Sequence, residues 1–209
     1  AYFEQAMLLC ALAHLTRHAG QALLSVERGR RIVRRLSEYA GLLRMHRSPC
    51  DLHHLVQETV EAFSGCFSGL RFTLTPADGP AVVHGDEKML RRLLLELFMN
   101  ASEACENGGQ VQVRLERRPG GGPAPQGSAG MLVLTVEDNG GGLPPGASPA
   151  AVFTPFFTTR SRQRNLGLGL ATALGIVRQH GGRITLGSHL GSGSQVLVCF
   201  PEELPPGAT

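Results

Sequence analysis

Apolar residues recur at helical spacing through the first part of the chain, from Ala1 to about Pro49. Two apolar stripes follow one another there, with a turn near Gly20 or Gly29, and Ser48-Pro49 ends the region. Because two helices of this size cannot bury both stripes alone, we expect them to pair with a second copy as a four-helix bundle. Residues 1–50 are therefore predicted to form a helical hairpin that dimerises.

From Asp51 the pattern changes to short strand-like stretches between helical ones. Strands are predicted at Leu70–Thr75, Ala81–His84, Val111–Arg117, Met131–Val136, Ile184–Leu186 and Gln195–Phe200. Helices are predicted at Leu52–Phe63, Leu90–Glu106 and Leu170–Val177. Helices on one face of a mixed or antiparallel sheet make an α/β sandwich over residues 51–201, so the fold class is α+β. The Gly/Pro-rich segment 118–130 is predicted as a flexible hairpin loop and residues 202–209 as a tail.

One strand-type run ends abruptly at Asp138, which Gly140, Gly141 and Gly142 follow. The glycines allow the backbone to take positive φ and to approach a flat ligand closely. Asp138 places a carboxylate acceptor at a strand end, which suits a ring with an exocyclic amine, such as adenine. Taken alone, this motif is equally typical of an ordinary turn.

Gly167 and Gly169 open the apolar helical run that begins at Leu170. A glycine-rich turn before a helix binds anions, because free N–H groups and the positive end of the helix dipole point outward. Glu96 and Asn100, four residues apart, share one face of an upstream helix. Together they could hold Mg²⁺ against phosphates, or form a surface polar pair without a ligand. The three motifs together indicate a nucleotide site.

These motifs resemble, in this order, the ATP-binding domain of sensor histidine kinases, within the GHKL superfamily shared with gyrase, the Hsp90 chaperones and MutL. Residues 96–104, E-L-F-M-N-A-S-E-A, are similar to the N box, and residues 137–142, E-D-N-G-G-G, to the G1 box. The F box and G2 box resemble F-T-P-F-F-T-T-R at 153–160 and N-L-G-L-G-L at 165–170. The match covers about Asp51 to Pro201. The helical hairpin before it resembles the dimerisation and phosphoacceptor hairpin of the same kinases.

The resemblance implies ATP and Mg²⁺ as cofactors and a role for each matching residue. Asp138 accepts from the adenine amine, Gly140 and Gly142 let the ring lie close, and Asn100 coordinates Mg²⁺. Phe156 and Phe157 are expected to pack a lid. The other implied nucleotide-binding residues are Phe157, Thr158, Thr159, Leu166, Gly167, Leu168, Gly169 and Leu170.

Two positions depart from the usual ATP-binding motifs. Most histidine kinases carry Asn four residues before the metal-binding Asn, whereas this chain has Glu96. Glu-x-x-x-Asn resembles the ATP-hydrolysing members and the mitochondrial dehydrogenase kinases, so Glu96 is a candidate catalytic base acting on histidine or water. A metal or solvent ligand is the alternative. Asn165 replaces the first glycine of the G2 box, and Asn tolerates left-handed geometry.

His14 is the candidate catalytic phosphoacceptor, in A-L-A-H-L-T-R-H-A-G. Leu15 stands where the family has an acid that accepts a proton from the imidazole. His18 and Ala19 replace the usual Asn or Thr and Pro, and the stretch up to Asp51 is shorter than the usual hairpin. A surface histidine, or a metal pair with His18, are the alternatives.

Composition limits the partners. The formal charge of +3 is too small to imply nucleic acid, and the basic run 28–35 favours a solvated helix face because no aromatic residues accompany it. No apolar run approaches the roughly 18 residues that span a bilayer, so no membrane contact is expected in this piece. Five scattered cysteines without C-x-x-C suit reduced thiols and a cytoplasmic location.

The expected function is that of an ATP-dependent protein-histidine kinase. It would phosphorylate itself within a homodimer and pass the phosphate to an aspartate of a response-regulator receiver domain. The alternative is an ATP-binding signalling or scaffold module with a degenerate phosphoacceptor site and no autokinase activity. Asp138, Asn100 and the glycine loop predict ATP binding in both cases, whereas the substitutions around His14 favour the second.

Overall fold

The computed structural model describes residues 45–67, 69–105, 108–119, 130–143, 146–158, 167–188 and 193–202. These residues all lie in the second of the two units into which the chain divides, Leu42–Thr209. Most of the predicted helical hairpin, residues 1–44, lies outside the described part, as do residues 120–129 of the predicted loop and residues 203–209.

The described chain alternates between helices and strands, as the hydrophobic pattern predicts. The strands are β1 (Ser48–Asp51), β2 (Leu70–Thr75), β3 (Val82–Gly85), β4 (Gly109–Pro119), β5 (Gly130–Asp138), β6 (Arg183–Ser188) and β7 (Ser194–Glu202). The helices are α2 (Leu52–Cys66), α3 (Glu87–Ala104), the short 3-10 helix η2 (Ala151–Phe153) and α4 (Gly169–Gln179).

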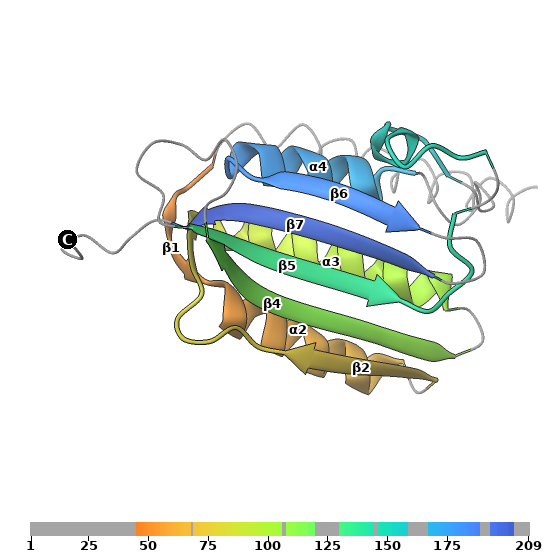
Figure 1. Cartoon of the computed structure of the whole chain (residues 1–209), viewed down its shortest axis with the longest axis horizontal. Helices are drawn as coiled ribbons and strands as arrows, with labels where there is room; N and C mark the ends of the chain where they lie inside the picture. The colour runs from red at the N-terminus through yellow and green to blue at the C-terminus, as the bar shows by residue number, and fades with distance from the viewer. Residues whose placement is uncertain are drawn as a thin grey trace, which may run out of the picture. The chain divides into compact units, whose positions relative to one another are not determined.

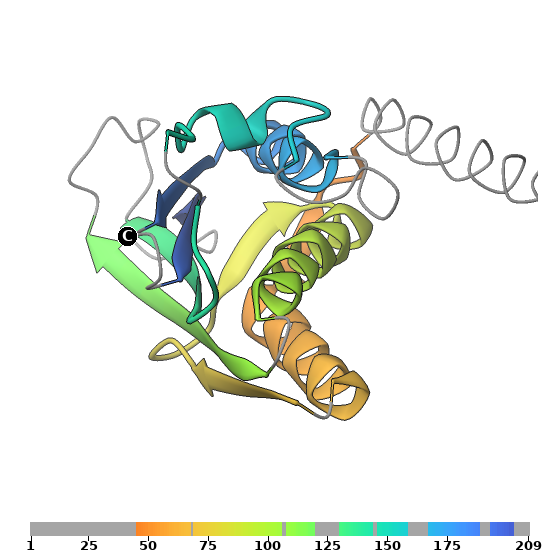
Figure 2. The same cartoon turned by 90° about the vertical axis from the view of Figure 1, so that its right-hand side faces the viewer.

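Five of the strands form one sheet in the order β2-β4-β5-β7-β6 (Figure 1). Strands β2 and β4 are parallel, whereas the other neighbouring pairs are antiparallel. Strands β1 and β3 form a separate antiparallel pair. Figure 2 shows α2, α3 and α4 on the same side of the sheet. This arrangement confirms the predicted α/β sandwich with a mixed sheet.

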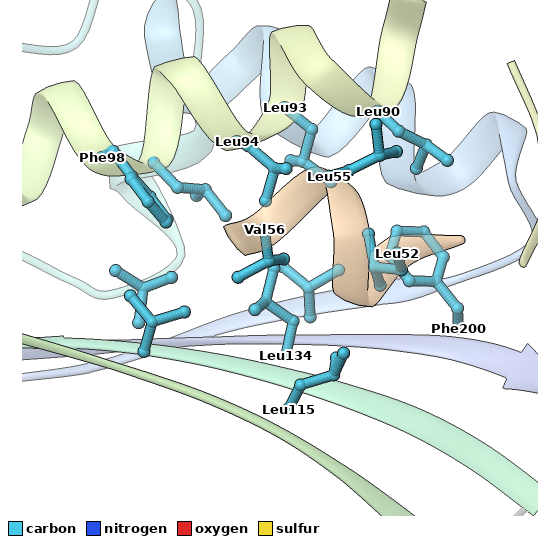
Figure 3. Packing of buried hydrophobic residues seen from close by; sticks show 14 of the residues in the cluster. Leu52, Leu55, Val56, Leu90, Leu93, Leu94, Phe98, Leu115, Leu134 and Phe200 are labelled. Carbon is cyan, nitrogen blue, oxygen red and sulfur yellow. The ribbon is translucent and has the colours of Figure 1, made fainter. Parts of the chain in front are cut away.

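The core lies between the helices and the inner face of the sheet (Figure 3). Helix α3 places its predicted apolar stripe there, with Leu90, Leu93, Leu94 and Leu97 almost fully buried. Burying each such side chain stabilises the fold by about 1.5–3 kcal/mol. The strands contribute inward-facing residues that include Leu115, Leu132, Leu134, Val198 and Phe200. The core thus fixes one face of α3 and, with it, the direction of Glu96 and Asn100 on the same helix.

Aspartates stand directly before the two longest helices of the described residues, α2 and α3. The Asp51 carboxylate accepts a hydrogen bond from the backbone N–H of His54 at 3.2 Å, and Asp86 accepts one from Met89 at 3.2 Å. Each satisfies a backbone donor that the first turn of a helix leaves without a partner. Helix α3 therefore begins at Glu87, before the first residue of the predicted apolar stripe, Leu90.

Several predicted boundaries are wrong in the described part; for example, Arg118, Pro119 and Gly130, which were expected in the loop, belong to β4 and β5. The helical region was expected to reach Pro49, but residues 45–47 are not helical and β1 occupies 48–51, where Pro49 pairs with His84 of β3. Long-range strand pairing, which local periodicity does not contain, decides this segment. Glu202 was expected in the tail, but it ends β7, and its carboxylate pairs with Arg117 at 2.6 Å.

His180 joins the end of α4 to the start of α3. Its Nε2 accepts a hydrogen bond from the backbone N–H of Asp86 at 3.1 Å, so Nδ1 carries the proton and donates to the Ile176 carbonyl at 2.8 Å. The ring lies where a side chain at Gly85 would stand, because a Cβ there would be 2.2 Å from the imidazole. Burial lowers the pKa of His180, and the nearby Arg47 guanidinium lowers it further.

His46 and Arg47, which precede β1, bind to the same start of α3 and end of α4. The backbone N–H of His46 donates to the Asp86 carboxylate at 3.0 Å, and Arg47 donates to the Gln179 carbonyl at 3.1 Å. Burial raises the pKa of Asp86, but hydrogen bonds from the backbone N–H groups of His46, Met89 and Lys88 outweigh this effect, so the pKa is lowered. The start of α3 and the end of α4 are thus connected through one cluster of polar contacts. No helix among the described residues is long and apolar enough to cross a membrane.

Candidate functional site

Asp138 is the last residue of β5 and is 7% exposed. Its Oδ1 accepts from the backbone N–H groups of Gly140 at 2.9 Å and Ser194 at 3.3 Å. Its Oδ2 accepts from the hydroxyl of Ser194 at 2.7 Å. A carboxylate has roughly four acceptor positions. These contacts therefore leave one position on Oδ2 for an external donor, which fits the exocyclic amine of adenine.

Ser194 is a residue of this site that the motif pattern did not identify. It is the first residue of β7 and pairs directly with Asp138 in the sheet register. The preceding Gly193 has a φ of 86°, and a Cβ at that position would lie 1.8 Å from the Asp138 carbonyl oxygen. Only glycine fits so close to the end of β5. A serine that follows a glycine at the start of a strand was the available sequence signal.

The three glycines after Asp138 differ in backbone conformation and in the space around them. All three were expected to allow positive φ and close contact with a ligand, but of these only Gly142 has a positive φ, of 69°. Gly140 instead lies against α3, where a Cβ would be 2.3 Å from the Ala104 carbonyl oxygen. A Cβ at Gly141 would meet no atom within 4 Å. Gly140 therefore serves the packing of the β5 end on α3.

Glu96 and Asn100 lie together against the first residue of α4. A Cβ at Gly169 would be 2.8 Å from Glu96 Oε2 and 3.5 Å from Asn100 Nδ2. Glu96 is 8% exposed, and Asn100 Nδ2 is buried without a hydrogen-bond partner. A 180° rotation of the amide exchanges its oxygen and nitrogen, so Asn100 can present either atom to a ligand. The shared face predicted for these two residues is present and is turned toward the glycine loop.

The glycine loop is fastened to the F-box segment before it. The backbone N–H of Phe156 donates to the Gly167 carbonyl at 2.8 Å, and a Cβ at Gly167 would be 2.4 Å from the Phe157 carbonyl oxygen. Gly167 has a φ of 65° and Phe156 one of 68°, so both take left-handed geometry at this contact. The loop that precedes α4 is thereby held by backbone contacts.

Helix α4 begins at Gly169 without a side-chain cap, because the residue before it is Leu168. Leu168 is buried, and Leu170 packs partly against the core. The N–H groups of this first turn are therefore available to an anion, together with the positive end of the helix dipole. The structure places this helix start beside Glu96 and Asn100, as the order of the motifs suggested.

The described residues include only some of those expected to form the lid. Phe157 and Thr158 are half-buried, whereas Phe156 is 57% exposed. Phe156, which was expected to pack a lid together with Phe157, has left-handed backbone and faces solvent. Thr159, Asn165 and Leu166 lie outside the described residues, as does His14. Within the described residues no group of three or more His, Cys, Asp or Glu side chains is arranged to hold a metal.

Comparison with known protein families and curated proteins agrees with this geometry. The family described as "Histidine kinase-, DNA gyrase B-, and HSP90-like ATPase" matches residues 85–204. The sensor histidine kinase ZraS of Escherichia coli (strain K12) is 31% identical over 179 residues, which cover 84% of this chain and 35% of ZraS. The sensor kinase CckA of Brucella abortus (strain 2308) is 32% identical over 126 residues, which cover 57% of this chain and 13% of CckA. The chain thus spans about a third or less of the length of these relatives.

Solved structures are similar as well. The mycobacterial sensor histidine kinase MprB has a TM-score of 0.63 and 27% identity, covering 77% of this chain and 100% of that chain. Full-length ShkA in complex with AMPPNP has a TM-score of 0.67 and 25% identity, covering 91% of this chain and 38% of ShkA. These findings confirm the predicted resemblance to sensor histidine kinases.

Proposed function

Because the chain belongs to the family of histidine kinase-, DNA gyrase B- and HSP90-like ATPases, we propose that it is an ATP-dependent protein-histidine kinase. One observation carries the proposal: α3 contacts both the base end and the phosphate end of the predicted nucleotide site. Gly140, beside Asp138, lies against Ala104 of α3, and Gly169 of the glycine loop lies against Glu96. A single helix thereby sets the separation of the two ends, as a nucleotide ligand requires.

The base end binds adenine through the remaining acceptor position of Asp138. Ser194 keeps the carboxylate in place by donating to both of its oxygens, so the free position on Oδ2 has a fixed direction. Gly142, with its positive φ, turns the chain away after this contact. Selectivity for adenine follows from the acceptor, because a carboxylate binds an amine at this ring position and repels a carbonyl oxygen.

The metal end is built around Asn100. Its buried amide lacks a hydrogen-bond partner and lies beside a carboxylate, so the donor set suits a hard cation with oxygen ligands. Bound Mg²⁺ would neutralise phosphate charge and keep the phosphates in place. Asn100 is the residue that would hold it, with Glu96 as the neighbouring carboxylate.

The phosphate end is the start of α4. The first-turn N–H groups of the helix, at Gly169 and Leu170, receive the phosphate tail, while Gly167 and Leu168 set the loop that leads to them. We also assign Phe157, Thr158, Thr159 and Leu166 to nucleotide binding, as the resemblance to the F box and the G2 box implies. Phosphoryl transfer depends mostly on positioning and charge neutralisation, which these groups supply.

The kinase part of the proposal rests on the N-terminal region. We assign His14 as the phosphoacceptor, within a hairpin that pairs two copies of the chain, and a response-regulator receiver domain as the next acceptor. The names of ZraS and CckA support this assignment, and the match to ZraS covers a larger share of this chain than the family match does.

Incubation of the full chain with γ-labelled ATP and Mg²⁺ tests the proposal. We expect a protein-bound label that is stable in base and labile in acid, as phosphohistidine is, and that is lost in His14→Ala and in Asp138→Asn. His54→Ala is the control, because His54 is an exposed histidine of α2 that pairs with Glu58. A label that persists in His14→Ala, or one that resists acid, would contradict the proposal.

A second function is favoured by one observation, the replacement of the expected acidic residue by Leu15 beside His14. Without that acid the imidazole lacks its usual proton acceptor. The chain would then be an ATP-binding signalling module without autokinase activity. ATP binding that Asp138→Asn abolishes, with no label on the wild-type chain, would establish this function in place of the first.

A further inference from the structure

Helix α3 contains two ion pairs at i, i+4 spacing that differ in order and in burial. Glu87 pairs with Arg91 at 2.9 Å on the exposed side of the helix. Arg92 Nη2 pairs with Glu96 Oε1 at 2.6 Å, and the side chain of Glu96 is only 10% exposed. A carboxylate that precedes its cation stabilises a helix better than the reverse order. The Arg92–Glu96 pair has the less favourable order, so it contributes less to helix stability than the Glu87–Arg91 pair does.

The pairing leaves the second oxygen of Glu96 facing the proposed phosphate end. Arg92 engages Oε1, whereas Oε2 lies 2.8 Å from the position that a Cβ of Gly169 would occupy. Asn100 Nδ2 lies 3.5 Å from the same position. Arg92 therefore fixes the rotation of the carboxylate and keeps Oε2 beside the metal-binding amide and the start of α4.

The positive charge of Arg92 also stabilises the buried Glu96 carboxylate beside the proposed phosphate end. A buried carboxylate is costly to keep charged without a cationic partner. A bound triphosphate would add like-charge repulsion at close range. The guanidinium, 2.6 Å from Oε1 of Glu96, offsets both effects.

We propose that Arg92 is the positioning residue of Glu96 in phosphoryl transfer, an inference that rests on the function proposed above. In this step the nucleophile, an imidazole or a water, forms a bond to the γ-phosphorus. The bond from that phosphorus to the oxygen shared with the β-phosphate breaks, and ADP leaves with its electron pair. The proton released by the nucleophile passes to Oε2 of Glu96, which Arg92 has placed.

Kinetics of the full chain with Mg²⁺-ATP test this inference through five variants: Arg92→Met, Arg92→Lys, Glu96→Gln, Arg92→Met/Glu96→Gln and Arg91→Met. General-base loss costs about 100-fold or more, so we expect Glu96→Gln to reduce kcat by that order. Misplacement of the carboxylate in Arg92→Met is expected to reduce kcat by about 10-fold or more. The nucleotide Kd should stay close to the wild-type value in both.

Three comparisons separate positioning from a structural role. Arg92→Lys, which keeps the charge, should recover most of kcat, and the double variant should be no slower than Glu96→Gln because Arg92 acts only through Glu96. Arg91→Met is the matched control, since Arg91 pairs with Glu58 and Glu87 away from the site. A readout without nucleotide is the ¹³C signal of the Glu96 carboxyl, which should move in Arg92→Met and stay unchanged in Arg91→Met.

Several outcomes would overturn the inference. They are an unchanged kcat in Arg92→Met, a further loss when it is combined with Glu96→Gln, or an unmoved carboxyl signal. A wild-type chain that binds Mg²⁺-ATP without turnover would also overturn it, because no proton transfer would remain for Glu96 to assist. A chain that binds no nucleotide would instead contradict the proposed function itself, so the two failures are distinguishable.

Discussion

Adjacent glycines after Asp138 have very different surroundings, and this difference gives a test at the scale of single residues. Gly140→Ala would place a methyl group 2.3 Å from the Ala104 carbonyl oxygen at the end of α3. Because backbone atoms cannot yield cheaply, we expect the substitution to lower the free energy of unfolding by about 1–3 kcal/mol. Equilibrium urea denaturation measures this loss.

Gly141→Ala is the matched control for the same measurement. Its Cβ would meet no atom within 4 Å, and Gly141 does not have a positive φ. We expect its free energy of unfolding to stay within about 0.5 kcal/mol of the wild type. Equal losses in the two variants would contradict the assignment of Gly140 to packing against α3.

The residues of the site differ in how far the sequence alone predicts them. Asp138, Glu96, Asn100, Gly167 and Gly169 stand in motifs whose local chemistry is visible, and the structure brings them to the ends and face of one helix. Ser194 and Arg92 were not identified. Ser194 lies beside Asp138 only because β5 and β7 pair in this register. The role proposed for Arg92 depends on the burial of its partner Glu96. Neither relation can be read from the spacing of residues along the chain.

At the scale of elements, periodicity predicts the helices and the central strands well. Helix α3 and strand β2 follow from their apolar patterns, because each buries one face in the core. Strand β1 was missed, since only its pairing with β3 makes it a strand. The polar contacts between α3 and α4 were missed for the same reason, because His180 and Asp86 are distant in sequence.

His180 gives an element-scale prediction, because it joins the start of α3 to the end of α4 as a neutral ring. Its pKa is lowered by burial from the ordinary value of 6.5. The unfolded chain therefore takes up a proton as the pH falls below about 6.5, while the folded chain does not. This contribution to stability is complete above that pH and is lost as the pH falls toward the lowered pKa, with a slope of up to about 1.4 kcal/mol per pH unit.

Urea denaturation between pH 7.5 and about 5 measures this slope in the wild type and in His180→Gln. We expect the variant to lose stability less steeply below pH 6.5, whatever its stability at pH 7.5, because it has no imidazole to titrate. The same slope in His180→Gln as in the wild type would show that His180 does not cause the pH dependence.

At the scale of the whole described domain, α3 is the element on which the account depends. The core fixes its apolar face, the β5 end lies against its last turn, and the start of α4 lies against Glu96 and Asn100. Because Gly140 beside Asp138 and Gly169 of the glycine loop both lie against this helix, α3 sets the separation of the proposed base end and phosphate end. The family match over residues 85–204 begins directly before this helix and ends after β7.

Equilibrium binding of Mg²⁺-ATP to the full chain tests this central claim most directly. We expect the wild type to bind, and Asp138→Asn to lose at least about 10-fold in affinity, because an amide in this position can present a donor to the adenine amine. Glu137→Gln is the control, since Glu137 precedes Asp138 in the chain but pairs with Arg114 and Gln195. Undiminished binding by Asp138→Asn, or an equal loss in both variants, would contradict the nucleotide site described here.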